Sequence, residues 1–398
     1  MTLSRRDFVK RGLRAAAAAV GAPGLARAAL AGGPPGKRLV VVFLRGAIDG
    51  LNVVVPHGDP GYYALRPSIA VPRDQVLDLD GCFGLHPALA SLAPLYRGGH
   101  LALVHAAGSP DPTRSHFDAQ DYMESGTPGV KSTPDGWLDR CGRRVGCGAA
   151  PLCAVSAGST VPRILAGPGG SFALGTGTPG GRDAREEQAV RAMYERSLDA
   201  PLREEARQAF LASARLGALE GAGAPPPGGG GALGQALPRL ARLLRADPGI
   251  RLAFADAGGW DHHVNEGGAE GQLANRLREL AGALERFWEG LGDAAGETVL
   301  VALSEFGRTA RENGSRGTDH GHGNVMLVLG GPVRGGAVYG RWPGLAPEQL
   351  HEGRDLAVTT DFRLVLAEVV DRHLGCDRVD AVFPGYAPGP AGYLGLLG

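Results

Sequence analysis

The sequence has no excess of either charge. Lys and Arg together number 41, as do Asp and Glu, so the formal net charge is zero. Proteins that bind nucleic acid usually carry a basic excess on one face, so this balance argues against a nucleic-acid partner. The chain also lacks an apolar run of the roughly 20 residues that a membrane-spanning helix needs. We therefore expect no transmembrane segment in the mature protein.

Two common motifs of hydrolases and nucleotide-binding proteins are missing. The chain contains neither Gly-x-Ser-x-Gly nor the phosphate-loop Gly-Lys-Ser/Thr. Residues 175–180, GTGTPG, formally match a dinucleotide-binding fingerprint, but no buried strand precedes them and Pro179 interrupts them. A nucleotide-dependent oxidoreductase would rest on this segment alone, and we reject it as a cofactor loop.

Cysteine is scarce and its number is odd. Five cysteines allow at most two disulfides and leave one thiol over. Cys141, Cys147 and Cys153 do not have zinc-ribbon spacing. Their spacing is compatible with a local disulfide among them, and we do not expect them to hold zinc.

Glycine, in contrast, is abundant. The chain has 65 Gly and 29 Pro, which predicts long irregular connections that carry function on a rigid scaffold. Residues 4–10, SRRDFVK, form a twin-arginine export motif, followed by an alanine-rich stretch and small-residue cleavage sites at 26–28 and 29–31. The order of these features disfavours an amphipathic helix of the mature protein. We expect residues 1–31 to be a removed twin-arginine signal peptide and the protein to be periplasmic or extracellular.

Short apolar runs alternate with helical stretches in the rest of the chain. The runs are rich in Val and Leu and end in Gly or charged residues, a pattern typical of strands buried in an α/β sheet. They occupy residues 37–44, 100–105, 250–255, 298–303 and 324–329. We expect one large α/β domain over residues 37–398, with a helical insertion at about 183–245.

Side chains of the kinds that bind ligands follow several of these strands. Open α/β sheets place ligand groups at the carboxyl ends of their strands, so these residues are candidates for a site. The candidates are Asp49, Asp261, His262, His263, Glu305, Arg308, Asp319, His320 and His322. Plainer interpretations stay open, because a charged loop is often a solvated connection with an ion pair and an Asp before Gly often only forms a turn.

Ser115 is placed to begin a helix that runs to about residue 125. A hydroxyl at a helix N-terminus faces backbone N–H groups and the positive end of the helix dipole, which suits a nucleophile that attacks an anionic ester. Ser is equally a favoured N-cap with no chemistry. We interpret Asp361 as a residue of this second kind.

The motifs together resemble one family. FLRGAIDGLNVVVP, RSHFDAQ, GGWDHH, SEFGRT, NGSRGTDHGHG, GGAVYG, TTDFR and FPG, behind a twin-arginine leader, are similar to the DUF1501 family of exported bacterial proteins. That family is placed with the alkaline phosphatase and sulfatase superfamily. The resemblance implies an alkaline phosphatase-like fold, a doubly wound, mostly parallel sheet sandwiched by helices, with metal ions and a nucleophile at the carboxyl ends of the strands.

The resemblance also implies roles for single residues. Asp49 corresponds to a metal-binding aspartate after the first strand, Asp261 and His263 to a ligand pair, and His320 to the last histidine ligand. Glu305 stands in the place of an aspartate ligand. Ser115 corresponds to the nucleophile. We add Asp319 to the metal ligands and His116, Arg45 and Arg308 to the catalytic residues, and we rank His262 and His322 below His263 and His320.

These roles imply metal-assisted displacement on a phosphate or sulfate ester. One or two divalent ions would activate Ser115, with Arg45 or Arg308 neutralising the ester oxygens. Imidazole ligands favour Zn²⁺ or Mn²⁺ over Ca²⁺. The alternative is an exported binding or assembly factor that keeps the fold and has lost the chemistry, since Glu305-Phe306 stands where the superfamily commonly has Asp-His. A second exported family, DUF1800, is a plausible protein partner in either case.

Overall fold

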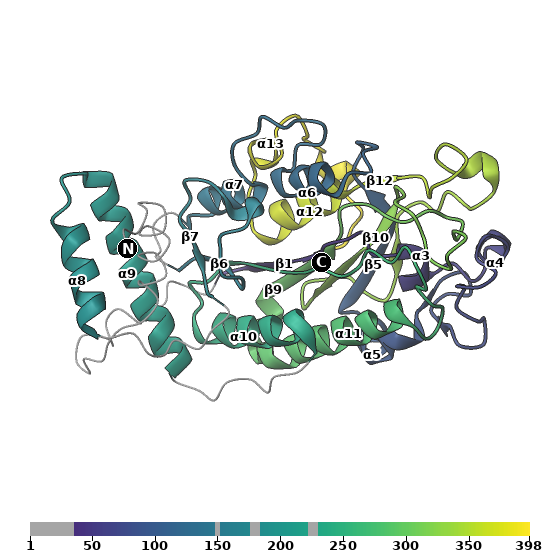
Figure 1. Cartoon of the computed structure of the whole chain (residues 1–398), viewed down its shortest axis with the longest axis horizontal. Helices are drawn as coiled ribbons and strands as arrows, with labels where there is room; N and C mark the ends of the chain where they lie inside the picture. Colours follow the sequence, from purple (N-terminus) through teal and green to yellow (C-terminus); the bar gives the residue numbers. More distant parts are fainter. Residues whose placement is uncertain (1–35, 148–151, 176–183, 222–229) are drawn as a thin grey trace, which may run out of the picture.

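The structure is a computed structural model that describes residues 36–147, 152–175, 184–221 and 230–398. Its centre is a nine-stranded sheet with the order β11-β5-β10-β9-β1-β8-β6-β7, and β12 pairs with β5 (Figure 1). The predicted signal peptide at residues 1–31 lies outside the described residues. Within the described parts of the chain, no helix has the length and apolar character needed to cross a membrane.

The middle strands of the sheet are predominantly apolar. They are β1 (Arg38–Leu44), β5 (Leu101–Gly108), β8 (Leu252–Ala257), β9 (Thr298–Leu303) and β10 (Asn324–Gly330), and they match the five predicted strands to within a few residues at each end. Shorter strands flank them: β6 (Ala154–Ser156), β7 (Ser171–Ala173), β11 (Val338–Tyr339) and β12 (Thr360–Asp361). All seven residues of β1 are buried, as expected for a strand covered on both faces.

Only β10 runs against the other strands of this sheet. β1 pairs in parallel with β8 and β9, and β6 pairs in parallel with β8 and β7. β10 is antiparallel to both β9 and β5, while β11 and β12 pair in parallel with β5. The sheet is therefore mostly parallel, as the sequence led us to expect. A separate three-stranded sheet contains β2 (Val54–Val55), β3 (Leu77–Asp78) and β4 (Gly84–Leu85).

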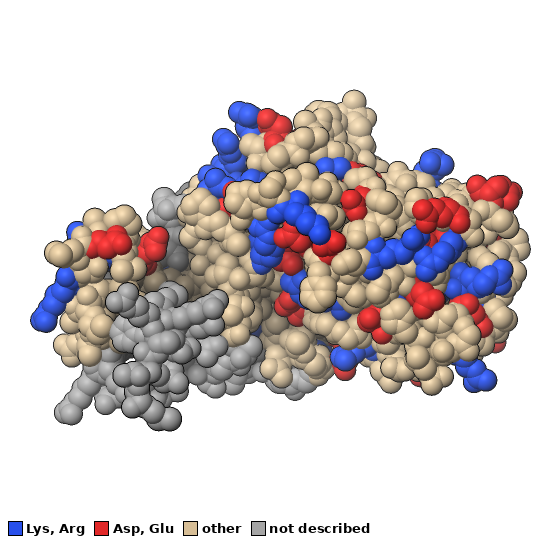
Figure 2. Space-filling view, turned by 45° about the horizontal axis from the view of Figure 1, so that its top comes forward, with Lys and Arg blue, Asp and Glu red and all other residues tan. Residues whose placement is uncertain are grey.

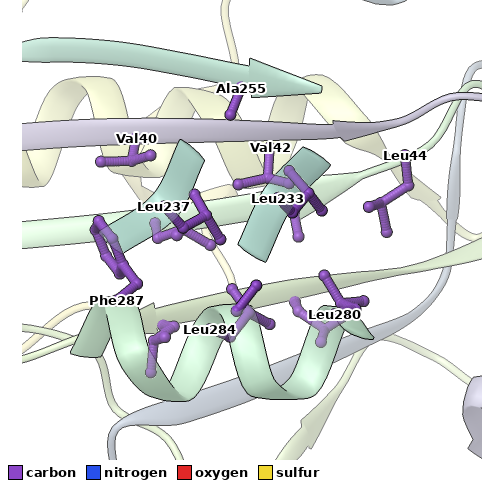
Figure 3. Close-up of a cluster of buried hydrophobic side chains, with 14 of the residues drawn as sticks. Val40, Val42, Leu44, Leu233, Leu237, Ala255, Leu280, Leu284 and Phe287 are labelled. Atoms are coloured by element: carbon purple, nitrogen blue, oxygen red, sulfur yellow. The ribbon is translucent and has the colours of Figure 1, made fainter. Parts of the chain in front are cut away.

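Helices cover both faces of the large sheet (Figure 1). On one face, Val40, Val42 and Leu44 of β1 pack against α10 (Gly231–Ala246) and α11 (Gln272–Leu291), as Figure 3 shows. The buried face of α11 follows helical spacing, with apolar side chains at Leu273, Leu277, Leu280, Leu284, Phe287 and Leu291.

The other face of β1 is formed by Leu39, Val41 and Phe43. These side chains share a core with α7 (Trp137–Arg144), α12 (Phe362–Glu368) and α13 (Val379–Val382). α6 (His116–Ser125) lies on the same side (Figure 1). The result is a three-layer α/β sandwich.

The remaining helices are peripheral. α3 (Gly50–Val53), α4 (Pro60–Leu65) and α5 (Ala93–Arg97) lie near one end of the sheet, and α8 (Ala184–Glu195) and α9 (Ala200–Gly221) lie at the other (Figure 1). Of the expected helical insertion at 183–245, α8 and α9 lie beyond β7, whereas α10 packs on the sheet. Acidic and basic side chains intermingle on the face shown in Figure 2, in agreement with the balanced composition.

Local features that the sequence predicted are also present. Cys147 and Cys153 form a disulfide, while Cys82, Cys141 and Cys376 are free thiols. Asp361 caps α12 by accepting a hydrogen bond from the backbone N–H of Arg363.

Candidate metal centre

The sheet brings loops from distant parts of the sequence to one edge. β1, β5, β8 and β9 run in the same direction, so the segments that follow them leave from the same edge. Because β10 is antiparallel, the segment that precedes it arrives at this edge too. His116, Asp261, Glu305 and His320 therefore meet although more than 200 residues separate the first from the last.

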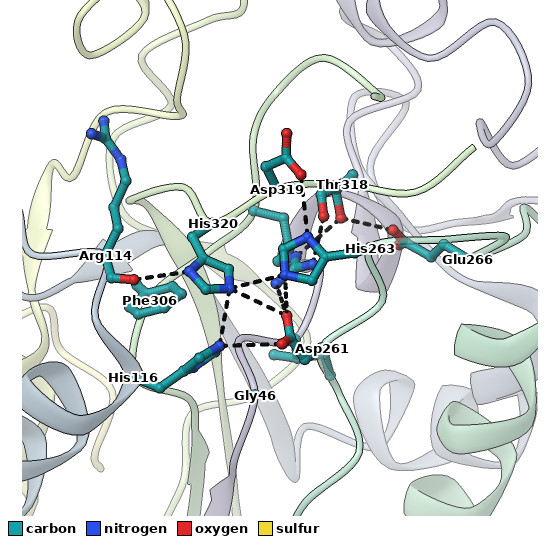
Figure 4. Close-up of polar contacts among 12 residues, drawn as sticks. Gly46, Arg114, His116, Asp261, His263, Glu266, Phe306, Thr318, Asp319 and His320 are labelled. Carbon is teal, nitrogen blue, oxygen red and sulfur yellow. Dashed lines mark hydrogen bonds and ion pairs between the residues drawn. The ribbon is translucent and has the colours of Figure 1, made fainter. Parts of the chain in front are cut away.

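Three imidazoles and one carboxylate converge at this edge (Figure 4). The Nε2 atom of His320 lies 3.0 Å from Nε2 of His116 and 3.0 Å from Nε2 of His263. The carboxylate of Asp261 lies 3.4 Å from Nε2 of His116, 2.9 Å from Nε2 of His263 and 3.3 Å from Nε2 of His320. His116, Asp261 and His320 each place one ligand atom within 4.8 Å of the others. Nε2 of His263 adjoins His320 and Asp261.

Each of the three imidazoles has its other ring nitrogen bound to an oxygen acceptor. Nδ1–H of His116 donates to Oε1 of Glu305 at 2.8 Å, and Nδ1–H of His320 donates to the Arg114 carbonyl at 2.8 Å. Nδ1–H of His263 donates to Oδ1 of Asp319 at 3.2 Å. A neutral imidazole carries one proton, so all three Nε2 atoms present lone pairs to one another and to the carboxylate. Only a cation or added protons can make this arrangement favourable.

The spacing and the donor types fit a transition metal. Zinc–nitrogen bonds of about 2.0 Å arranged as a tetrahedron separate neighbouring ligand atoms by about 3.3 Å. The observed separations of 2.9–3.4 Å bracket that value. Imidazole nitrogen with one carboxylate oxygen is a donor set that suits Zn²⁺ or Mn²⁺. Fixing the second ring nitrogen by a hydrogen bond is how proteins orient histidine ligands.

Electrostatics at the centre favour neutral His320 and ionised Asp261. Burial, with His116 and Arg308 nearby, lowers the pKa of His320. Burial alone would raise the pKa of Asp261, but the hydrogen bond and charge of Arg308 outweigh it and the pKa is lowered. The hydrogen bond to Glu305 raises the pKa of His116, so in the metal-free protein a proton competes for this position.

Glu305 is buried behind His116 and collects hydrogen bonds from several loops. Its Oε1 also accepts from the backbone N–H of Gly46 and from Nε2 of Gln120, each at 2.8 Å, and its Oε2 accepts from Oγ of Ser304 at 2.8 Å. Burial would raise the pKa of Glu305, but these donors, with His116 first among them, lower it. Glu305 is thus an anionic support for His116.

A sequence comparison places these residues in a family. A family model described as "Protein of unknown function (DUF1501)" matches residues 102–383, which is more than half of the chain and includes every residue of the converging cluster. The chain belongs to the DUF1501 family. No curated protein matches the DUF1501 chain in sequence.

Three bacterial proteins are among the solved structures that match this chain. The C-terminal periplasmic domain of EptC from Escherichia coli in complex with Zn gives a TM-score of 0.36 at 9% identity, covering 75% of this chain and 74% of that one. Phosphonate monoester hydrolase of Agrobacterium radiobacter gives 0.37 at 12% identity, with 89% and 78% covered. An alkaline phosphatase superfamily protein from Vibrio parahaemolyticus gives 0.34 at 9% identity, with 82% and 69% covered. These TM-scores are below 0.5, so the three likenesses do not indicate a function for the DUF1501 protein.

Glu305 and Asp319, both expected as metal ligands, do not join the converging atoms but hold two of the histidines by hydrogen bonds. Glu305 holds His116, and Asp319 holds His263 while accepting a second hydrogen bond from Asn313 at 3.1 Å. Arg308, expected among the catalytic residues, is buried and donates to Oδ1 of Asp261 at 2.6 Å. Both carboxylates and the guanidinium orient groups of the centre.

Three other expected site residues are held elsewhere. Asp49 is buried in an ion pair with Arg66, whose Nη2 lies 2.9 Å from its Oδ1. Burial would raise the pKa of Asp49, but Arg66 outweighs it and the pKa is lowered. Arg45 pairs with Glu124 at 2.8 Å and Asp256 at 2.5 Å, and reaches the centre only through Gln120. Ser115 caps α6, and its exposed hydroxyl accepts from the backbone N–H of Asp118 at 3.4 Å.

The two histidines that we ranked lower do not point into the centre. His262 is buried, with Nδ1 unpartnered, and its backbone carbonyl accepts from Thr318. His322 stacks on His351 at 4.5 Å between ring centroids. Burial lowers the pKa of each to about 4, so both are neutral near pH 7.

Sequence reasoning missed three groups that orient the centre. They are the carbonyl of Arg114, the side chain of Gln120 and Thr318, which binds both Arg308 and Glu266. Arg114 and Gln120 both lie within the RSHFDAQ motif. The motif therefore marked their positions, although we assigned them no role.

Glycines let the loops approach each other closely. Gly46 has φ +116°, and a Cβ there would lie 2.9 Å from the backbone nitrogen of Asp261. At Gly321, a Cβ would lie 2.3 Å from the backbone of Arg308. Larger residues at either position would push the ligand-bearing loops apart.

Proposed function

We propose that this protein is a metal-dependent hydrolase or transferase that acts on phosphate or sulfate esters. One observation carries the proposal: three imidazoles present their Nε2 lone pairs to each other and to Asp261 while their Nδ1 protons are bound to oxygen atoms. A purely structural ion pair would not require the Nε2 lone pairs of three histidines to face one another.

We propose one ion, Zn²⁺ or Mn²⁺, held by His116, Asp261 and His320 with His263 as a further ligand. Within the described ranges, these residues contain the one cluster of ligand atoms that is close enough to bind an ion. Asp49, which we expected as a metal ligand after the first strand, is already neutralised by Arg66. A bound metal of this kind supplies Lewis acidity to an ester oxygen and lowers the pKa of a bound hydroxyl or water.

The chain's own residues orient and protect the centre. Glu305 and Asp319 fix the rings of His116 and His263, and Arg308 fixes the carboxylate of Asp261. Arg308 and Arg45 were expected to neutralise ester oxygens, but each is paired with carboxylates, and we assign both to positioning. The ligand side chains remain 24–39% exposed, so an ester can approach from solvent.

Ser115 remains our candidate nucleophile. Its hydroxyl is exposed and belongs to the residue next to the ligand His116. If Ser115 accepts the phosphoryl or sulfuryl group, Ser115→Ala should lower kcat by about three orders of magnitude or more and leave the metal content unchanged. A variant with kcat close to that of the native protein would assign the attack to water instead.

The main test is metal analysis with an activity assay. Protein purified without chelator is expected to contain one equivalent of zinc or manganese and to hydrolyse 4-nitrophenyl phosphate or sulfate. His320→Ala should lose both properties. His351→Ala is the matched control, since its ring stacks on His322 outside the cluster. A folded, inert native protein without metal would refute the proposal.

A second candidate function is an exported assembly or binding factor. Its support is the pair α8 and α9, which lies at one end of the molecule. Large apolar side chains are exposed there: Met193 of α8 is 53% exposed, and Leu198, between the two helices, is 99% exposed. We propose a DUF1800-type exported protein as the partner in this case. Retention of the native protein, but not of Leu198→Glu, by such a partner would support it.

We further propose that the protein reaches the periplasm or the extracellular space by the twin-arginine route. The support is the SRRDFVK motif and the cleavage sites that follow it. Replacing Arg5 and Arg6 by Lys should retain the precursor in the cytoplasm, which fractionation would detect.

A further inference from the structure

A large cavity adjoins the metal centre and has no role in the proposed chemistry. Its volume is about 1010 Å³, and segments from residues 58–65, 309–319 and 342–354 line it. This volume is at the upper end of the roughly 300–1,000 Å³ of cavities that enclose small ligands. The cavity therefore has room for much more than a phosphate or sulfate group.

One wall of this cavity is apolar and fixed in place. It includes Leu65, Trp342, Leu345 and Leu350. The indole of Trp342 packs edge-on against Phe83 and His105, with centroid distances of 5.3 and 4.8 Å, and its Nε1–H donates to Asp59 at 3.1 Å. Leu345 is 2% exposed, so the wall is anchored in the core. A preformed apolar wall binds an apolar chain at low entropic cost.

Asp59 and Glu312, two carboxylates that line the cavity, accept hydrogen bonds from neighbouring residues, whereas the guanidinium of Arg311 has no such partner in the described parts of the chain. Asp59 accepts from the backbone N–H of Gly61 as well as from Trp342, and Glu312 accepts three hydrogen bonds from Ser68 and Ile69. Arg311 is exposed and has no side-chain partner among the described residues. The cavity thus offers one free positive charge beside its apolar wall.

Asp319 joins the cavity to the metal centre. Its side chain lines the cavity and also accepts the Nδ1 proton of His263. Asn313, which donates to the same oxygen of Asp319, lines the cavity as well. One imidazole ring therefore separates the Asp319 carboxylate of the cavity wall from the converging Nε2 atoms.

We propose that the cavity binds the non-reacting part of the ester, and that this part is a long apolar chain with an anionic group that pairs with Arg311. The inference rests on the proposed function for the reacting end of the substrate. It adds the substrate class, an anionic amphiphile, which the metal centre alone does not specify.

The test measures binding and does not require turnover. Ethyl-, butyl-, hexyl- and octylphosphonate are titrated into the native protein by calorimetry. Each methylene that enters the cavity is expected to lower Kd by about fourfold. Ala64→Glu, at an exposed position of α4 that lines the cavity, and Leu350→Glu should each weaken octylphosphonate binding at least tenfold and leave ethylphosphonate binding unchanged. Ala214→Glu, at an exposed position of α9, is the matched control and should bind as the native protein does.

The charge of Arg311 is tested with 8-phosphonooctanoate, which carries a second anion at the far end of the chain. Arg311→Gln should weaken binding of this ligand about fivefold, as expected for an exposed ion pair, and leave octylphosphonate unchanged. Arg316→Gln, in the same loop and outside the cavity lining, should change neither ligand.

The outcomes separate this inference from the proposed function. Equal Kd values for ethyl- and octylphosphonate, or octylphosphonate binding that Ala64→Glu does not alter, would overturn the inference even if metal and hydrolysis are present. Chain-length dependence that persists in His320→Ala supports the cavity as the apolar subsite even if the native protein hydrolyses nothing.

Discussion

Replacing Glu305 by Gln isolates the contribution of one negative charge to metal binding. Oε1 of Glu305 accepts from His116, Gly46 and Gln120, and its Oε2 accepts from Ser304. A glutamine can keep the first three bonds through its carbonyl oxygen. Its amide takes the place of Oε2 and can donate to Oγ of Ser304, provided that the hydroxyl proton of Ser304 turns from residue 305 to the carbonyl of Leu44, 2.5 Å away. The variant should therefore fold, with stability lowered by about 1–2 kcal/mol.

The loss should appear in metal affinity. Without the carboxylate, the ring of His116 keeps its orientation but becomes a weaker base at Nε2. Removing an anionic partner behind a histidine ligand lowers metal affinity about 10–100-fold, equivalent to roughly 1.4–2.7 kcal/mol. We expect a change in this range for Glu305→Gln, measured by competition with a chromophoric zinc chelator at fixed pH.

The control is Glu312→Gln. Glu312 also accepts three hydrogen bonds, two of them from backbone N–H groups, but it does not contact any ligand of the centre. Its replacement should leave zinc affinity unchanged. If both variants bind zinc as tightly as the native protein, His116 is not a ligand whose basicity matters, and the assignment of the centre is wrong.

Three further predictions concern stability and pH. Asp49→Ala should leave the fully buried Arg66 without its carboxylate partner and lower the free energy of unfolding, measured in urea, by about 3–5 kcal/mol. The variant should keep one metal per chain. Loss of the metal would instead make Asp49 a ligand. Phe287→Ala should lower the free energy of unfolding by about 3–5 kcal/mol in the same assay, because this side chain is 1% exposed between α11 and the sheet. A decrease below about 1 kcal/mol would contradict the packing in Figure 3. Zinc affinity should rise as the pH increases from 6.5 through the raised pKa of His116, because a proton then competes less with the ion for Nε2. Over the same pH range, the metal-free protein should lose the stability that protonated His116 contributes. A zinc affinity that does not change with pH in this range would contradict the prediction.

The sheet was predictable from sequence for a physical reason. Strands covered on both faces need apolar residues at nearly every position, so β1, β9 and β10 are visible as Val- and Leu-rich runs and β8 as a shorter apolar run. The ends of these runs also located Asp261 and His263, because parallel strands deliver the residues that follow them to one edge, and His320, because it lies in the segment that connects β9 to the antiparallel β10.

The partners of the polar side chains were not predictable in this way. Asp49 follows β1 as a ligand would, but Arg66 lies 17 residues later in an irregular segment, and no periodicity indicates that the two meet. Glu305 is a carboxylate, as a ligand would be, yet it binds Nδ1 of His116 and does not face the converging Nε2 atoms. This contact depends on where α6 places His116, which the sequence does not reveal. Hydrogen bonds between loops decide which carboxylate faces the ion and which supports a neighbour.

The antiparallel direction of β10 has a consequence for how the protein matures. His320 precedes β10, and His116 and Asp261 follow β5 and β8, so the binding atoms are assembled only when strands from both halves of the chain are in register. If the proposed ion binds at this centre, a half-folded chain would hold it only weakly, and metal content per chain would report the fraction of molecules that have completed the sheet.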